Sequence, residues 1–142
     1  MLAVAGLEVS QNRLRRYNKL GFFGIPLDEW RANDGGYYLS VLDVKVSSLD
    51  SPLILGYANA RKLKQLGHAT FTYDSMDRLV VSIQGISFLI NFTDELFVIN
   101  EVFVSNEYNF LTNEDFVVID VGLNIGATSL FFARKPNVRS VH

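Results

Sequence analysis

The sequence predicts an α/β protein in two parts: a small α+β region over residues 1–105, then an incomplete parallel βαβ sheet over residues 106–142. Three observations predict this division. Short alternating segments separated by polar turns fill the first part. A polar stretch, Asn106–Glu114, follows it. Beyond that stretch come an apolar run, a glycine-bearing turn, a helical pattern and another apolar segment, an order typical of a βαβ unit.

The first part is expected to begin with a helix and a strand. Leu7–Leu20 has apolar residues at helical spacing, and the glycines and proline that follow interrupt that pattern. Asn33–Gly36 is a strong turn, after which Tyr37–Ser47 is predicted to form one strand. The residues expected to face inward from this strand are Leu42, Val44 and Val46.

A helix, three paired strands and a second helix are expected next. Ser51 can cap a helix that begins at Pro52 and runs to Leu66, with Gly67 as its left-handed stop. Thr93, followed by two acidic residues, is expected to cap the second helix. The three strands are predicted at Ala69–Tyr73, Arg78–Ile83 and Ile86–Asn91. One side of the second helix is expected to carry Leu96, Ile99 and Phe103.

The composition excludes several classes of function. Thirteen basic and fifteen acidic residues give a formal charge of −2, which is unlike the basic surface of a nucleic-acid-binding protein. The chain has no cysteine, which excludes disulfides and thiolate metal sites, and we expect no metal site. No apolar run reaches the roughly 18 residues of a membrane span. Met1–Leu7 is mildly apolar with basic residues downstream, the reverse of a secretory signal, and this predicts a cytoplasmic protein.

The residues after the polar stretch carry the motif with chemical meaning. Phe116–Ile119 is a continuous apolar run, as expected of a parallel strand buried on both faces, and a helix is predicted at Ala127–Arg134. Ligands of open α/β sheets bind beyond the carboxyl ends of such strands. A glycine there lets the backbone approach a ligand, and a carboxylate can hold an amine or a hydroxyl. The turn between strand and helix supplies Asp120, Gly122, Asn124 and Gly126.

The spacing of this turn excludes two phosphate-binding motifs. A dinucleotide fingerprint requires glycines where Asn124 and Ala127 stand. The phosphate loop requires four residues between its glycines and a lysine after them. Gly122 and Gly126 are one residue too close for that loop, and no lysine follows.

The turn instead has the D-x-G-x-[GN]-x-G form and resembles the first motif of Rossmann-like S-adenosylmethionine-dependent methyltransferases, in particular the FkbM-type family. Asp94–Phe103 and the pair Glu107-Tyr108 are similar to the lead-in of those enzymes, so the resemblance covers Ile86–His142. It implies S-adenosylmethionine as cofactor. It further implies that Tyr108 helps to close the pocket for the methionine end of the cofactor. The residues that line this end by resemblance are Asp120, Gly122, Asn124 and Gly126.

The resemblance implies a fragment of a methyltransferase that acts on a hydroxyl oxygen of a small molecule or a sugar. The acid that binds the cofactor ribose in that family would follow the strand at Val138–Val141. We therefore expect the 142 residues to end before the domain is complete and not to turn over substrate by themselves. No catalytic residue is identified. The strands at Val117–Val121 and Val138–Val141 are expected to be poorly ordered or to pair with another copy, giving a homo-oligomer. The alternative is that residues 1–105 form a non-enzymatic recognition or oligomerisation module.

Overall fold

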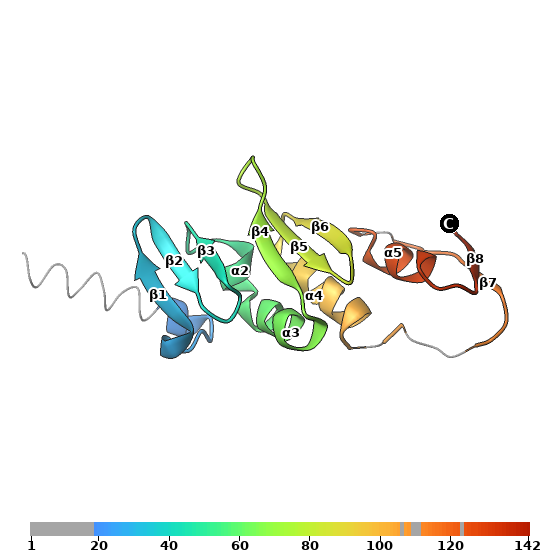
Figure 1. Ribbon diagram of the computed structural model, residues 1–142, viewed down its shortest axis with the longest axis horizontal. Helices are drawn as coiled ribbons and strands as arrows, with labels where there is room; N and C mark the ends of the chain where they lie inside the picture. Colours follow the sequence, from blue (N-terminus) through green and yellow to red (C-terminus); the bar gives the residue numbers. More distant parts are fainter. Residues whose placement is uncertain (1–18, 106, 109–111, 123) are drawn as a thin grey trace, which may run out of the picture.

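The computed structural model describes residues 19–105, 107–108, 112–122 and 124–142, and it is a mixed α+β structure. Three small sheets follow one another along the long axis of the molecule (Figure 1). The helix predicted at Leu7–Leu20 lies outside the described residues except for its last two, which are helical. None of the helices in the described part is long and apolar enough to cross a membrane.

The first sheet is an antiparallel meander of β1 (Trp30–Asn33), β2 (Gly36–Leu39) and β3 (Val44–Val46), preceded by a 3₁₀ turn, η1 (Leu27–Glu29). The prediction of a single strand over residues 37–47 is wrong. The chain turns back after β2, and Asp43 takes a left-handed conformation with φ of 55°. The predicted inward residues Leu42, Val44 and Val46 are nevertheless buried. The strand β1 was not expected from the sequence.

The predicted helix after Ser51 is divided into α2 (Pro52–Leu55) and α3 (Tyr57–Gly67). Ser51 caps it as expected, because its Oγ accepts a hydrogen bond from the Leu53 amide at 3.3 Å. The division occurs at Gly56, where a Cβ atom would lie 2.9 Å from Leu96 Cδ1. Glycine at this position therefore permits the close approach of a later helix.

The stop of α3 is one residue later than predicted. His68, not Gly67, takes the left-handed conformation, with φ of 55°. The role of Gly67 is packing, because a Cβ atom there would lie 2.7 Å from Ile83 Cδ1 and 2.9 Å from Val104 Cγ2. Glycine is needed at position 67 because a side chain would not fit there, and not because the helix stops at this residue.

The second sheet agrees with the prediction. Its strands β4 (Thr70–Tyr73), β5 (Leu79–Ile83) and β6 (Ile86–Ile90) form an antiparallel meander. Gln84 and Gly85, both with positive φ, make the tight turn between β5 and β6.

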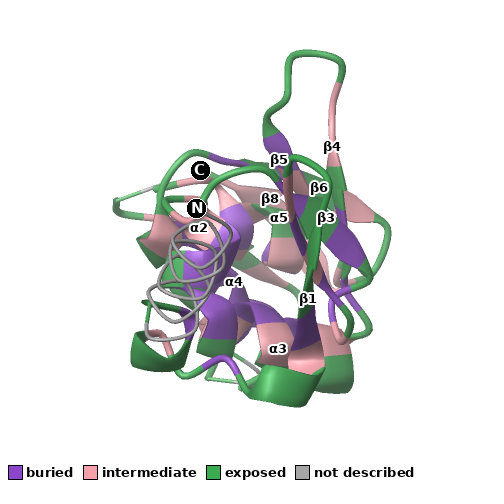
Figure 2. Cartoon of the chain, turned by 90° about the vertical axis from the view of Figure 1, so that its left-hand side faces the viewer, coloured by how far each residue is buried: buried purple, intermediate pink, exposed green. Residues whose placement is uncertain are grey.

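The helix α4 (Thr93–Phe103) contributes buried residues to the core. It begins where predicted, but Thr93 is its first residue and not its cap. The buried Glu95 carboxylate accepts hydrogen bonds from the amides of Asn91 and Phe92, at 2.6 and 3.0 Å. Buried positions of α4 lie in the centre of the view in Figure 2. They include the predicted Leu96, Ile99 and Phe103.

The third sheet is a parallel pair, β7 (Phe116–Val118) and β8 (Val138–Val141), joined through α5 (Ala127–Ala133). This is the βαβ order that the sequence predicts. The two strands pair with one another. The sequence had led us to expect that they would be poorly ordered or would pair with a second copy. The prediction of a strand buried on both faces is wrong, because Val117 is 53% exposed and Ile119 is 75% exposed.

A chain of aromatic rings attaches this βαβ unit to the rest of the fold. Phe103 at the end of α4 contacts Phe88 of β6 at 5.7 Å between ring centroids and Phe131 of α5 at 5.6 Å. Phe131 contacts Phe132, which in turn meets Phe116 of β7. All these contacts are edge-on, the arrangement that aromatic rings prefer.

Candidate functional site

A cavity of about 430 Å³ lies where the loop after β7 faces α4 and α5. Its size is within the range of small-molecule sites, about 300–1,000 Å³. Its walls combine apolar side chains with a few polar groups, as is usual for such sites. The apolar part consists of Val98, Val118, Ile119, Val121, Ala127 and Phe132. The remaining lining residues are Glu101, Tyr108, Asp120, Gly122, Asn124 and Thr128.

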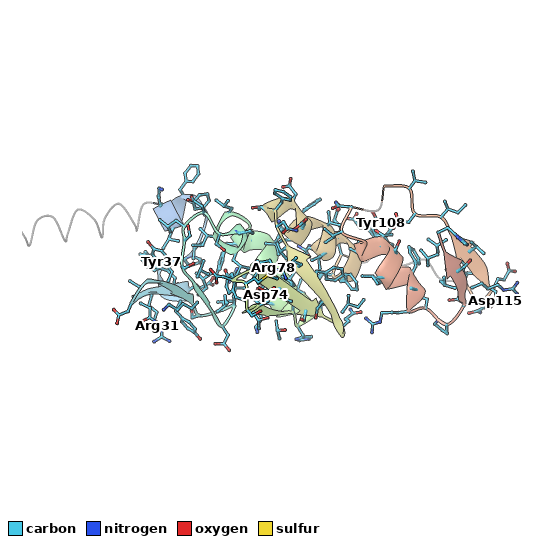
Figure 3. The ribbon with its side chains drawn as sticks, turned by 90° about the horizontal axis from the view of Figure 1, so that it is seen from above. Arg31, Tyr37, Asp74, Arg78, Tyr108 and Asp115 are labelled. Carbon is cyan, nitrogen blue, oxygen red and sulfur yellow. The ribbon has the colours of Figure 1, made fainter. Side chains whose placement is uncertain are left out.

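The structure brings four of the five predicted site residues to this cavity, namely Tyr108, Asp120, Gly122 and Asn124. Gly126, the fifth, does not line it and is the residue that precedes α5. Tyr108 comes from the segment between α4 and β7 and is 38% exposed. It lines the cavity together with residues of α4 and α5, and it is labelled near these two helices in Figure 3.

Glu101 and Thr128 line the cavity but are absent from the predicted site. Glu101 lies in the stretch that resembles the methyltransferase lead-in, so the sequence contained a signal for it. Thr128 stands in the first turn of α5 and carries no such signal.

The loop of the site depends on left-handed backbone conformations. Gly122 has φ of 100°, Asn124 has φ of 44° and Gly126 has φ of 75°. Glycine adopts such angles without steric cost, and asparagine tolerates the left-handed region better than most residues. A Cβ atom on Gly122 would meet no atom within 4 Å, so its need for glycine is conformational. The positive φ angles of these three residues accompany the change of chain direction between β7 and α5.

Two sets of hydrogen bonds hold Asp120. Its amide donates to the His142 carbonyl at 2.6 Å, and the His142 amide donates to the Val118 carbonyl at 2.9 Å, which extends the pairing of β7 with β8. Ser129 Oγ of α5 donates to Asp120 Oδ2 at 2.6 Å. A hydrogen bond to an ionised carboxylate is stronger than one between neutral groups. The Asp120 carboxylate is therefore oriented before any ligand binds.

The charges around the cavity have one sign. Glu101 and Asp120 are acidic, and no lysine, arginine or histidine is among the described residues that line it. Such a lining attracts a cationic group and repels a phosphate, since like charges at short range disfavour each other. In the described part of the chain, no group of three or more histidine, aspartate or glutamate side chains could hold a metal ion.

A second cavity, of about 360 Å³, lies between the segment around Ser51 and the second sheet. Ser51 Oγ and the Tyr73 hydroxyl are 3.3 Å apart at its wall, and burial raises the pKa of Tyr73. Its Arg78 forms an ion pair with Asp74 at 2.7 Å (Figure 3). No sequence motif falls on this cavity, and its one basic side chain already has a partner in Asp74.

No family model matches the chain, and no curated protein or solved structure matches it either.

Proposed function

We propose that the chain is part of an S-adenosylmethionine-dependent methyltransferase and that the cavity beside β7 receives the methionine end of this cofactor. The proposed reaction is transfer of the methyl group to a hydroxyl oxygen of a small molecule or a sugar. The observation that carries the proposal is convergence: residues chosen by resemblance alone, Tyr108, Asp120, Gly122 and Asn124, line one cavity of suitable size.

The chemistry of the cavity fits this ligand better than the nucleotides that similar loops bind. The methionine end of S-adenosylmethionine carries one carboxylate and two cationic groups, an ammonium and a sulfonium, and the two cationic groups suit the carboxylates of Glu101 and Asp120. A nucleotide phosphate would lie against the same carboxylates without a basic residue in the lining. The exclusion of both phosphate-binding motifs by the glycine spacing points the same way.

The proposed roles of the residues concern binding and orientation. Asp120, held by Ser129, would accept a hydrogen bond from the ammonium group, and the glycine of the loop would allow close approach of the backbone. Tyr108 would cover the open side. S-adenosylmethionine supplies an electrophilic methyl group, and an enzyme accelerates its transfer chiefly by aligning donor and acceptor, with a base to take the hydroxyl proton. We assign no base.

Isothermal titration calorimetry with S-adenosylmethionine tests the proposal. We expect binding to the wild-type chain and at least about tenfold weaker binding to Asp120→Asn, because a charge-assisted hydrogen bond is replaced by a neutral one. Asp115→Asn is the matched control, since Asp115 lies outside the cavity and pairs with Arg139. Absence of binding to the wild-type chain would reject the cavity as the site for the methionine end of the cofactor. Equal losses in the two variants would reject the site.

A cytoplasmic location and a homo-oligomer belong to the same proposal and rest on the sequence. For oligomerisation, Val117 gives a specific reason, because it is 53% exposed and lies outside the cavity, and an apolar side chain at an open strand favours association.

A separate module over residues 1–105 remains the second candidate. It is favoured by the core, whose buried residues come from positions 20–103 with the exception of Ala127. Its proposed role is recognition or oligomerisation without catalysis.

A further inference from the structure

Glu101 lines the same cavity as the predicted binding loop. It belongs to α4, whereas Asp120 follows β7, so two separate elements each contribute one acidic residue to the lining of a space of about 430 Å³. The helix α4 is anchored by buried residues on either side of Glu101, Asn100 and Val102. The position of Glu101 therefore does not depend on the loop.

The carboxylate of Glu101 has no basic partner within the described part of the chain. Among the residues that the structure describes, none donates a hydrogen bond to its side chain or forms an ion pair with it. Asp120, by contrast, is hydrogen-bonded by Ser129. Both residues line the same cavity, so a ligand cation bound there would be attracted by two carboxylates.

We infer that Glu101 is a specificity-determining residue that binds a cationic group of the ligand together with Asp120. The inference rests on the proposed function and extends it in one respect: it assigns recognition of positive charge to α4, outside the loop motif. Two groups of S-adenosylmethionine share this chemistry, the ammonium and the sulfonium. S-adenosylhomocysteine retains the ammonium and lacks the sulfonium, so the two ligands distinguish them.

The experiment compares the affinities of both ligands for the wild-type chain, Glu101→Gln and the control Glu114→Gln, by calorimetry at low and high salt. Glu114 is exposed and lies outside the cavity. Glutamine keeps the shape of Glu101 and removes its charge. We expect Glu101→Gln to weaken S-adenosylmethionine binding by about tenfold or more and to reduce its salt dependence, and Glu114→Gln to change neither.

The pattern across the two ligands identifies the group. A loss for both ligands indicates the ammonium, and a loss for S-adenosylmethionine alone indicates the sulfonium. Unchanged affinity in Glu101→Gln, or a loss that leaves the salt dependence of the wild type, would overturn the inference while S-adenosylmethionine binding itself upholds the proposed function. A wild-type chain that binds neither ligand would overturn both. Glu101→Asp, which keeps the charge, is expected to recover part of the affinity.

Discussion

Replacement of Phe103 by alanine tests how the βαβ unit is joined to the rest of the molecule. Phe103 is 5% exposed and is the ring between β6 and α5, with contacts to Phe88 at 5.7 Å and to Phe131 at 5.6 Å. Its removal leaves a cavity between three elements and breaks both edge-on contacts.

The expected cost is about 3–5 kcal/mol of the free energy of unfolding, the range for a buried phenylalanine cut back to alanine. Each lost aromatic contact accounts for about 0.5–1.5 kcal/mol of this amount. A domain of this size is stable by only about 5–15 kcal/mol, so the variant should lose a large part of its stability. The melting temperature should fall by roughly 10 °C or more.

Urea unfolding followed by circular dichroism measures this loss, with Phe97→Ala as the matched control. Phe97 is also a phenylalanine of α4, but it is 50% exposed, and its removal should cost about 1 kcal/mol or less. Similar midpoints for the two variants would refute the packing of α4 against α5 described above.

Three further predictions concern the first part of the chain. Gly36→Ala should cost more than about 2 kcal/mol in urea unfolding, because its Cβ would lie 2.2 Å from the Val46 carbonyl oxygen; an unchanged midpoint would contradict the register of β2 with β3. Burial raises the pKa of Tyr57, and so does Glu29, whose Oε2 accepts a hydrogen bond from the Tyr57 hydroxyl at 2.6 Å. The stability from the neutral phenol is therefore present below the usual tyrosine pKa of about 10 and declines as the pH rises above it. Tyr57→Phe should flatten this decline in unfolding measurements between about pH 9 and 11, and an unaltered slope would assign it to other groups. Residues 1–105 expressed alone should unfold cooperatively if they are a module, whereas a gradual transition would argue against one.

Local signals in the sequence were sufficient where a turn residue acts on its own neighbours. The β4–β5–β6 meander follows from its polar turns, and the pair Gln84-Gly85 takes the positive φ angles that such a turn needs. The cap of α2 is equally local, because Ser51 Oγ accepts a hydrogen bond from the amide of Leu53, two residues later.

Long-range packing determined what the sequence did not predict. Gly56 leaves space for Leu96 of α4, and Gly67 leaves space for Ile83 and Val104, residues distant in sequence. A period-two pattern over residues 37–47 suited both one strand and a hairpin, and only the pairing of Tyr37 with Val46 decides between them.

The candidate site was predicted from the loop after β7 and from Tyr108, and the cavity is also lined by residues of α4. The motif identified Asp120, Gly122 and Asn124, because their chemistry is local to the turn. It did not identify Glu101 as a site residue, since the face of α4 that meets the cavity is set by the packing of the helix. Gly126 shapes the entry to α5 without lining the cavity.

Amide resonances of the ¹⁵N-labelled chain, recorded while S-adenosylmethionine is added, test most directly whether the loop after β7 is the cofactor site. We expect saturable shifts around Glu101, Tyr108 and the residues from Val118 to Thr128, where the cavity lies. The second cavity, around Ser51 and Tyr73, should remain unaffected. Shifts centred on the second cavity, or a spectrum unchanged at saturating ligand, would contradict the assignment of the β7 loop as the cofactor site.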